Sequence, residues 1–150
     1  MIDIKNNRSN CPLSTSLEIV GDHWSLIIIR DLFFERTTFS QFRNSPEKIA
    51  SNILTNRLKK LLEYNLIGYV LNPKNKKVKI YYLNDSGIDL YPIIFGLLIW
   101  GKKNINMNFL PMSIDWYNEA DGKTLSEINN DGAFKYLNFR KTILEKMKAQ

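Results

Sequence analysis

The residues with the clearest chemical potential are two asparagines one helical turn apart, Asn52 and Asn56. An asparagine amide can accept from N6 and donate to N7 of adenine at once, so an exposed pair on one helix face could distinguish base edges in the DNA major groove. Ser51 and Thr55 lie beside them and can contact either bases or phosphates. The alternative is a solvated helix face on which Ser51 serves only as an N-cap.

A helix of about 51–64 is the element that would carry this face. At 100° per residue its apolar side chains gather on one side, and these are Leu54, Leu58, Leu61 and Leu62. Lys59 and Lys60 are placed to contact phosphates, which add affinity without sequence information. Arg57 projects toward the edge of the apolar side, where it can pair with an acid or with a phosphate.

The positive charge of the chain is confined to the same region. The 150 residues carry 21 Lys+Arg and 15 Asp+Glu, a net charge of +6. Residues 47–80 hold eight basic and two acidic side chains, while 1–46 and 81–150 each sum to zero. A localised excess of this kind marks a surface for a polyanion more specifically than a generally basic surface does.

Three of these lysines, Lys74, Lys76 and Lys77, are expected in the loop of a hairpin. The β-rich runs 66–71 and 78–83 flank the turn-forming segment 72–77 and predict its two strands. At such a tip the lysines could lie along the DNA backbone or enter an adjacent minor groove. The alternative is that these lysines only make the turn soluble and contact no DNA.

Composition excludes several other classes of protein. One cysteine and one histidine rule out an internal disulfide and a zinc site of Cys and His ligands. The longest uncharged apolar run, 90–101, is about half of the roughly 20 residues that a membrane helix needs, and the N-terminus has no secretory pattern. No phosphate-binding loop or nucleophile elbow is present. We therefore expect a cytoplasmic protein that is not an enzyme, with no cofactor, metal or membrane partner.

The elements before the asparagine-bearing helix are predicted from their caps. Pro12 opens a helix of 12–20 that stops at Gly21, and Asp22 caps an apolar, buried helix of about 23–34. Arg30 on that helix is expected to be a paired structural arginine. A short third helix is expected to be capped by Ser40, and its polar residues join the candidate DNA contacts, namely Ser40, Gln41 and Arg43.

Helices are also expected after the hairpin, beginning with a long apolar helix of 88–100. The following segments are predicted as an irregular or single-turn piece at 111–118, a short helix or strand at 124–128, a turn at 130–132 and an amphipathic helix at 133–148. We divide the chain into a DNA-binding unit, 1–104, which includes the dimerisation helices, and a C-terminal extension, 105–150, which is expected to be helical and to pack on the dimer.

The order of helix, helix, short helix, exposed polar helix and basic hairpin is that of a winged helix-turn-helix. Several motifs narrow the comparison: Cys11-Pro12, Gly21-Asp22-His23-Trp24, Ile29-Arg30-Asp31-Leu32, Phe39-Ser40-Gln41-Phe42, Leu54-Thr55-Asn56-Arg57-Leu58-Lys59-Lys60-Leu61, Tyr81-Tyr82-Leu83-Asn84-Asp85-Ser86-Gly87 and Trp100-Gly101. In this order and spacing, over about 11–101, they resemble the HxlR-type bacterial transcription regulators, relatives of the MarR group. The chain departs from that pattern at His23 and Asn84 and in its longer tail.

The resemblance implies a homodimeric cytoplasmic regulator, which we expect to be a repressor, on a roughly palindromic double-stranded operator. Such regulators often respond to oxidants, electrophiles or small metabolites. The residues themselves support a dimer, because the helices 12–20 and 88–100 hold more apolar surface than a small winged core can cover. The alternative function is a protein-interaction module that keeps the fold without specific DNA binding.

Cys11 is the candidate for redox sensing. It is the only thiol, and the start of a helix favours an anion and hence the thiolate form. The resemblance points the same way, since several members of the family carry a sensing cysteine at this place. The alternative is a small residue that packs at the dimer interface.

Overall fold

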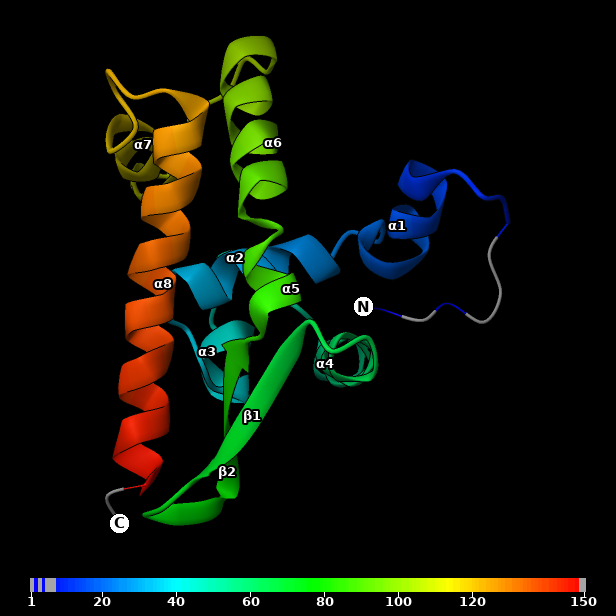
Figure 1. The fold of residues 1–150 in the computed structure, drawn as a ribbon, viewed down its shortest axis with the longest axis vertical. Coiled ribbons are helices and arrows are strands. Elements are labelled where there is room, and N and C mark those ends of the chain that lie inside the picture. The colour runs from blue at the N-terminus through cyan, green and yellow to red at the C-terminus, as the bar shows by residue number, and fades with distance from the viewer. Residues whose placement is uncertain (1, 3, 5–7, 149–150) are drawn as a thin grey trace.

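The computed structural model describes residues 2, 4 and 8–148. Its elements are, in chain order, α1 (Pro12–Val20), α2 (Ser25–Phe33), α3 (Phe39–Arg43), α4 (Ser51–Glu63), β1 (Ile67–Asn72), β2 (Asn75–Leu83), α5 (Asp85–Ile88), α6 (Tyr91–Asn104), α7 (Pro111–Asn118) and α8 (Leu125–Lys148). The fold is mainly helical, with β1 and β2 forming one antiparallel hairpin (Figure 1). Helices α2 to α4 followed by this hairpin confirm the winged helix-turn-helix.

The core of the winged helix-turn-helix is built around α2. Ile29 and Leu32 are fully buried, and Ile28 is nearly so. The predicted apolar side of α4 packs toward them through Leu54, Leu58 and Leu61, while Leu62 is only partly buried. Burying a leucine or isoleucine side chain contributes about 1.5–3 kcal/mol, so these residues hold α4 to the body and leave its other side in solvent.

The first two helices begin and end close to their predicted limits. Gly21 ends α1 with φ of −76°, so it does not supply a left-handed turn. Glycine is required there because a Cβ would lie 2.4 Å from the Leu17 carbonyl oxygen. Asp22 Oδ1 accepts hydrogen bonds from the backbone N–H groups of Trp24 and Ser25, both at 3.0 Å. The helix itself begins at Ser25 with Trp24 at the N-cap position, two residues later than predicted, and Asp22 caps the turn that precedes it.

The predicted cap of α3 is wrong. Thr38, not Ser40, occupies the N-cap position, and Phe39 is the first residue of the helix. Thr38 Oγ1 accepts from the backbone N–H of Gln41 at 3.3 Å, and Gln41 Oε1 accepts from the backbone N–H of Thr38 at 3.0 Å. This reciprocal capping box satisfies two backbone donors. Ser40, two residues later, already lies inside the helix and cannot cap it.

The hairpin turn is shorter than the predicted loop. Only Pro73 and Lys74 separate the strands, so Lys76 and Lys77 lie on β2. Asn72 Oδ1 accepts from the backbone N–H of Lys74 at 2.9 Å, and Asn75 pairs with Asn72 across the turn. An asparagine side chain that bonds the backbone two residues on closes a tight turn by itself, which allows β2 to begin early.

The long helix predicted at 88–100 is interrupted. Of the predicted range only Ile88 lies in the single turn α5, and α6 starts at Tyr91 with Pro92 in its first turn. The segment 111–118, expected as an irregular or single-turn piece, is the helix α7. Pro111 occupies the first position of α7, where a proline is well tolerated.

The turn predicted at 130–132 is also wrong, because α8 runs through it without a break. Thr124 and Glu127 form a second capping box at its start. Gly132 lies inside the helix, where α8 packs against α6, and a Cβ there would lie 2.2 Å from Cζ of Tyr91. Glycine therefore serves close helix packing here and not a turn.

The C-terminal helix runs alongside α6 and continues past the base of the hairpin (Figure 1). The Tyr136 hydroxyl accepts from the backbone N–H of Leu83 at 2.9 Å, and Arg140 donates to the Leu83 carbonyl at 3.1 Å. Trp116 Nε1 on α7 donates to the Tyr91 hydroxyl at 2.8 Å. The extension is thus tied to both α6 and the wing. Across the described residues, no helix combines the length and apolar character needed to cross a membrane.

Gly132→Ala should lower the free energy of unfolding by about 1–3 kcal/mol, as forcing a methyl group into a packed contact does. Helix propensity alone would change stability in the opposite direction, by about 1 kcal/mol. Urea unfolding followed by circular dichroism gives the sign. Asn138→Ala, at an exposed position of α8, is the control and should be neutral or slightly stabilising. A stabilised Gly132→Ala would show that α8 does not pack tightly on Tyr91.

Candidate nucleic-acid interface

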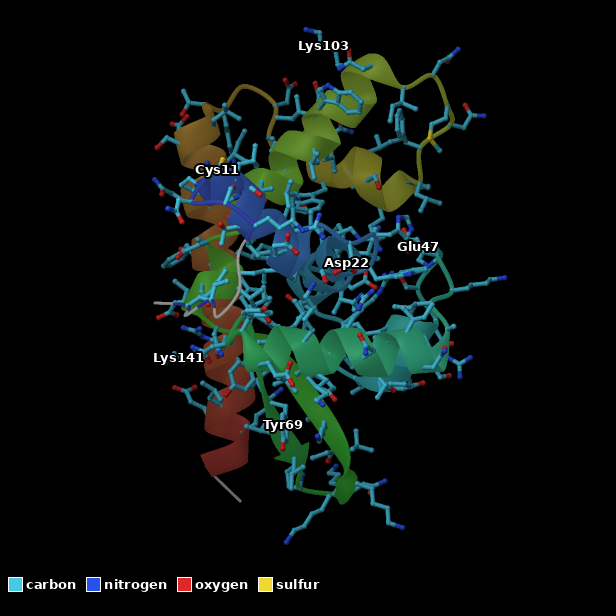
Figure 2. The ribbon with its side chains drawn as sticks, turned by 90° about the vertical axis from the view of Figure 1, so that its right-hand side faces the viewer. Cys11, Asp22, Glu47, Tyr69, Lys103 and Lys141 are labelled. Atoms are coloured by element: carbon cyan, nitrogen blue, oxygen red, sulfur yellow. The ribbon has the colours of Figure 1, made fainter. Side chains whose placement is uncertain are left out.

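The polar side of α4 faces solvent beside the hairpin (Figure 2). Its exposed residues include the predicted base and phosphate contacts Ser51, Asn52, Thr55, Asn56 and Lys59. A groove between α3, α4 and β2 is lined by residues of all three elements, among them Ser40, Thr55, Lys59 and Lys77. The structure therefore brings candidate residues from the third helix, the fourth helix and the wing onto one surface.

Arg57 pairs with an acid in the single chain, which is one of the two alternatives that its position on the helix allowed. Its Nε atom lies 2.8 Å from Asp22 Oδ1. This nitrogen is buried and has no hydrogen-bond partner in the described part of the chain, so the contact is held by charge. Arg57 Nη1 also donates to Asn56 Oδ1 at 2.7 Å, which orients the amide of the candidate base-contacting residue.

Lys60 is turned toward the same carboxylate. Its Nζ lies 3.4 Å from Asp22 Oδ2, and its side chain is 23% exposed, against 78% for Lys59. Asp22 thus joins the start of α2 to the middle of α4 through two cations. Lys60 and Arg57 are anchors of α4 in this structure, and Lys59 is the helix lysine that projects into solvent.

The ionised form of Asp22 is stabilised by its neighbours. Burial raises the pKa of this carboxyl, but the Ser25 hydroxyl, the N–H groups of Trp24 and Ser25, and the charge of Arg57 together lower it below its usual value. The Ser25 Oγ donates to Asp22 Oδ2 at 2.5 Å. Asp22 consequently keeps its charge well below neutral pH, and the anchor of α4 stays intact there.

A second group of ion pairs fixes the loop before α4. The Asp31 carboxylate is 1% exposed, and its Oδ1 lies 2.7 Å from Arg30 Nη2 and 2.9 Å from Arg36 Nη1. Arg30 also holds Glu47 by two hydrogen bonds of 2.6 and 2.9 Å. Glu47 lies in the segment between α3 and α4 (Figure 2). Arg30 is therefore the paired structural arginine that the sequence predicts.

Glu47 was not among the predicted residues, although its pKa is strongly shifted by its neighbours. Hydrogen bonds from Arg30 are the main reason that the pKa of Glu47 falls from 4.5 to about 2, and they outweigh the effect of burial. Burial lowers the pKa of Arg30, but the hydrogen bonds that it donates to Glu47 and the charge of Asp31 raise it above its ordinary value. Both partners are thus charged at any pH near neutrality.

The remaining candidates are exposed, with some local contacts. Ser40 and Arg43 on α3 face solvent, as do Lys74, Lys76 and Lys77 on the wing. Gln41 is exposed, although its Oε1 is engaged in the α3 capping box. The Thr55 hydroxyl donates to the Ser51 carbonyl at 2.8 Å, and its oxygen still has lone pairs that can accept. Lys79, which was not predicted as a contact, lies 4.1 Å from the centre of the Tyr69 ring.

Cys11 lies at the start of α1, apart from the interface (Figure 2). It occupies the N-cap position, where its carbonyl accepts from the backbone N–H of Thr15 at 3.0 Å. Its side chain is exposed in the single chain. A packing role for Cys11 would therefore need a second chain to cover it.

An exposed polar helix, anchored by ion pairs and flanked by a basic wing, defines a winged helix-turn-helix regulator. Residues 19–109 match the model of the HxlR-like helix-turn-helix family. The chain belongs to this family, and it is a transcriptional regulator of the helix-turn-helix type and not an enzyme. This confirms the class of protein that the sequence motifs suggest.

Relatives and solved structures agree with this assignment. The chain is 30% identical over 93 residues to the HTH-type transcriptional regulator YdeP of Bacillus subtilis, covering 62% of this chain and 73% of YdeP. An HTH-type transcriptional regulator of Mycobacterium bovis is 30% identical over 101 residues, which are 67% of this chain and 63% of that protein.

Among solved structures, that of the candidate transcription factor PA1607 is similar with a TM-score of 0.60 and 33% identity, covering 69% of this chain and 70% of PA1607. The redox regulator HypR in its oxidised form has a TM-score of 0.58 and 24% identity, covering 65% of this chain and all of HypR. At 24% identity, the similarity to HypR shows a common fold and no more.

Glu47→Gln should lower the free energy of unfolding at pH 7 by about 2 kcal/mol. The reason is that the pKa of Glu47 is depressed from its ordinary value of 4.5, so the charged carboxylate stabilises the folded state at pH values above 4.5. That stabilisation is lost as pH falls from about 5 toward 2. Urea titrations at several pH values should therefore show the variant and the native chain converging in acid. Glu63→Gln, which removes a surface pair with Lys59 at 3.8 Å, should change stability by less than about 1 kcal/mol at any pH.

Proposed function

We propose that this protein is a sequence-specific regulator of transcription that binds double-stranded DNA with α4 in the major groove and the hairpin beside it. The observation that carries the proposal is the solvent-facing polar side of α4, which shares a groove with α3 and β2. The segment 47–80 that contains α4 and the wing also carries the whole net positive charge of the chain. A helix of this kind fits the major groove and contacts bases through its N-terminal half.

Different side chains serve affinity and specificity. We assign base contacts to Asn52 and Asn56, since Arg57 uses one lone pair of the Asn56 amide oxygen and leaves the other available. Ser51 and Thr55 can assist at bases or phosphates. The proposed phosphate contacts are Ser40, Gln41, Arg43, Lys59, Lys74, Lys76 and Lys77. Arg57 and Lys60 act indirectly, by fixing α4 through Asp22.

A homodimer on a palindromic operator is part of the proposal. Large apolar side chains of α1 and α6 are between 50% and 69% exposed in the single chain, namely Leu13, Leu17, Ile93, Leu97 and Trp100. A second copy that covers them would place two α4 helices in successive major grooves, with half-sites about 10 base pairs apart or a multiple of that. We propose that the bound dimer acts as a repressor, by competing for the same DNA with the transcription machinery.

Selection from a random duplex library should return a palindrome, and two substitutions on it should have different effects. Asn56→Ala should cost about 1–3 kcal/mol of discrimination at one base pair. Lys76→Ala should weaken binding about equally on all duplexes and reduce the slope of log K against log salt by about 1. Fluorescence anisotropy at several salt concentrations separates the two effects.

Lys141→Ala is the matched control, because this lysine is exposed on α8 (Figure 2) and lies outside the proposed interface. Its affinity and salt slope should equal those of the native chain. Equal losses of Asn56→Ala on selected and random DNA would remove Asn56 as a base contact. A chain that prefers no duplex even at low salt would favour the protein-interaction module.

We also propose that oxidants or electrophiles act through Cys11, although a small effector is a second route. The supporting observation is an exposed thiol at the N-cap of α1, the helix whose Leu13 and Leu17 belong to the proposed dimer surface. The chain has no second cysteine. A disulfide can therefore form only with Cys11 of another copy or with a small thiol.

Diamide should release operator DNA from the native protein and leave Cys11→Ser bound. Diamide accepts two electrons and two protons when two thiols join as a disulfide, so a covalent dimer on a non-reducing gel should accompany the release. Reduction with dithiothreitol should restore binding. The same response in both proteins would show that the signal enters elsewhere.

A further inference from the structure

We propose that the C-terminal extension completes a binding pocket for a small organic cation, such as an aromatic or alkyl ammonium compound. A cavity of about 320 Å³ lies between the end of α2 and the helices α6, α7 and α8. This volume is at the lower end of the range for small-molecule sites. The family match ends at residue 109, so α7 and α8, which supply much of the lining, lie beyond the part that defines the family.

Aromatic rings form the wall of the cavity. The Trp116 ring is central, with its centroid 4.9 Å from that of Phe34, 5.6 Å from Tyr91 and 5.8 Å from Phe95, each in an edge-to-face arrangement. The face of an aromatic ring carries partial negative charge and attracts a cation placed over it, most strongly for tryptophan. A wall of this composition favours an apolar cation over a polar neutral molecule.

The charges of the lining have the matching sign. Four carboxylates and two lysines line the cavity. Lys123 pairs with Asp131 at 2.8 Å, and Lys135 pairs with Glu119 at 3.6 Å. The other two carboxylates are those of Glu35 and Asp115, and neither makes an ion pair with any residue that the structure describes. Two negative charges are therefore left at the cavity for a ligand to neutralise.

The cationic side chains that an anionic ligand would need are already paired with carboxylates. Trp116 Nε1 donates to the Tyr91 hydroxyl at 2.8 Å, and both lysines face carboxylates. An anion would have to break these contacts and approach Glu35 and Asp115. Since like charges disfavour such an approach, the pocket selects by charge as well as by apolar surface.

The pocket is also joined to the wing. Tyr136 lines the cavity, and its hydroxyl accepts from the backbone N–H of Leu83 at the end of β2. Phe33 from the end of α2 packs edge-to-face on both Tyr91 and Tyr136, with centroids 5.0 and 5.2 Å apart. A ligand that moves Tyr136 would therefore shift the base of the wing. This regulatory step, unlike the binding itself, rests on the proposed DNA-binding function.

Isothermal titration calorimetry on the full chain tests the pocket with three probes of similar size. Benzyltrimethylammonium should bind saturably, uncharged N-benzylacetamide about tenfold or more weakly, and benzenesulfonate not measurably. The double variant Glu35→Gln/Asp115→Asn should weaken the cation by about tenfold or more. Both carboxylates are exposed, so this variant should fold. Glu145→Gln, at an exposed carboxylate further along α8, is the control and should bind as the native chain does.

Tryptophan fluorescence locates the bound probe. The Trp24→Phe/Trp100→Phe variant keeps Trp116 as its single tryptophan, and its emission should change with the same midpoint as the calorimetric titration. Equal affinity for the three probes, no effect of the double variant, or no binding up to about 10 mM would overturn the proposal.

Anisotropy of operator DNA, measured separately with and without the cation, tests the coupling between the pocket and the wing. A cation that binds but leaves DNA affinity unchanged would overturn only the coupling. A protein that binds no DNA even without the cation would count against the proposed function and not against the pocket.

Discussion

The buried carboxylate of Asp31 is the constraint on which the placement of α4 depends. It is held between the guanidinium groups of Arg30 and Arg36, and Arg30 extends the network to Glu47 before α4. A buried ion pair adds little net stability, but removal of one partner leaves an uncompensated charge and costs about 3–5 kcal/mol. Leucines alone would let α4 slide or rotate against α2, whereas charged hydrogen bonds have a preferred geometry. Asp22 applies the same constraint from the other end of α2.

The order of elements in the first half of the chain could be predicted because each signal is local. Pro12 and Asp22 mark helix starts, and the leucines of α4 repeat at helical spacing. The pairing of Arg57 and Lys60 with Asp22 could not be predicted, since these partners are far apart in the sequence and meet only after α4 packs on α2. Glu47 was missed for the same reason. A helical projection shows the side on which a cation lies, but not the acid that it meets.

The errors in the tail have a different physical cause. Asn130, Asp131 and Gly132 have the composition of a turn, yet α8 continues through them because the interhelical contact with Tyr91 requires a residue without a side chain. Tertiary packing overrides local preference here. The capping box at Thr38 shows the opposite case, in which the local signal is sufficient but two neighbouring candidates compete, and the correct one is identified by the glutamine three residues later.

The contacts between β2 and its surroundings have a consequence for how the protein behaves at high concentration. The backbone N–H of Tyr81 donates to the Thr37 carbonyl, and both backbone groups of Leu83 are bonded to α8. The outer edge of β2 is therefore closed near its base. Further out, the edge carries Lys79 and Lys77, and charged side chains on an edge strand oppose pairing with a strand of another molecule. Lys77 and Lys79 thus oppose edge-to-edge pairing of β2 with a strand of another molecule.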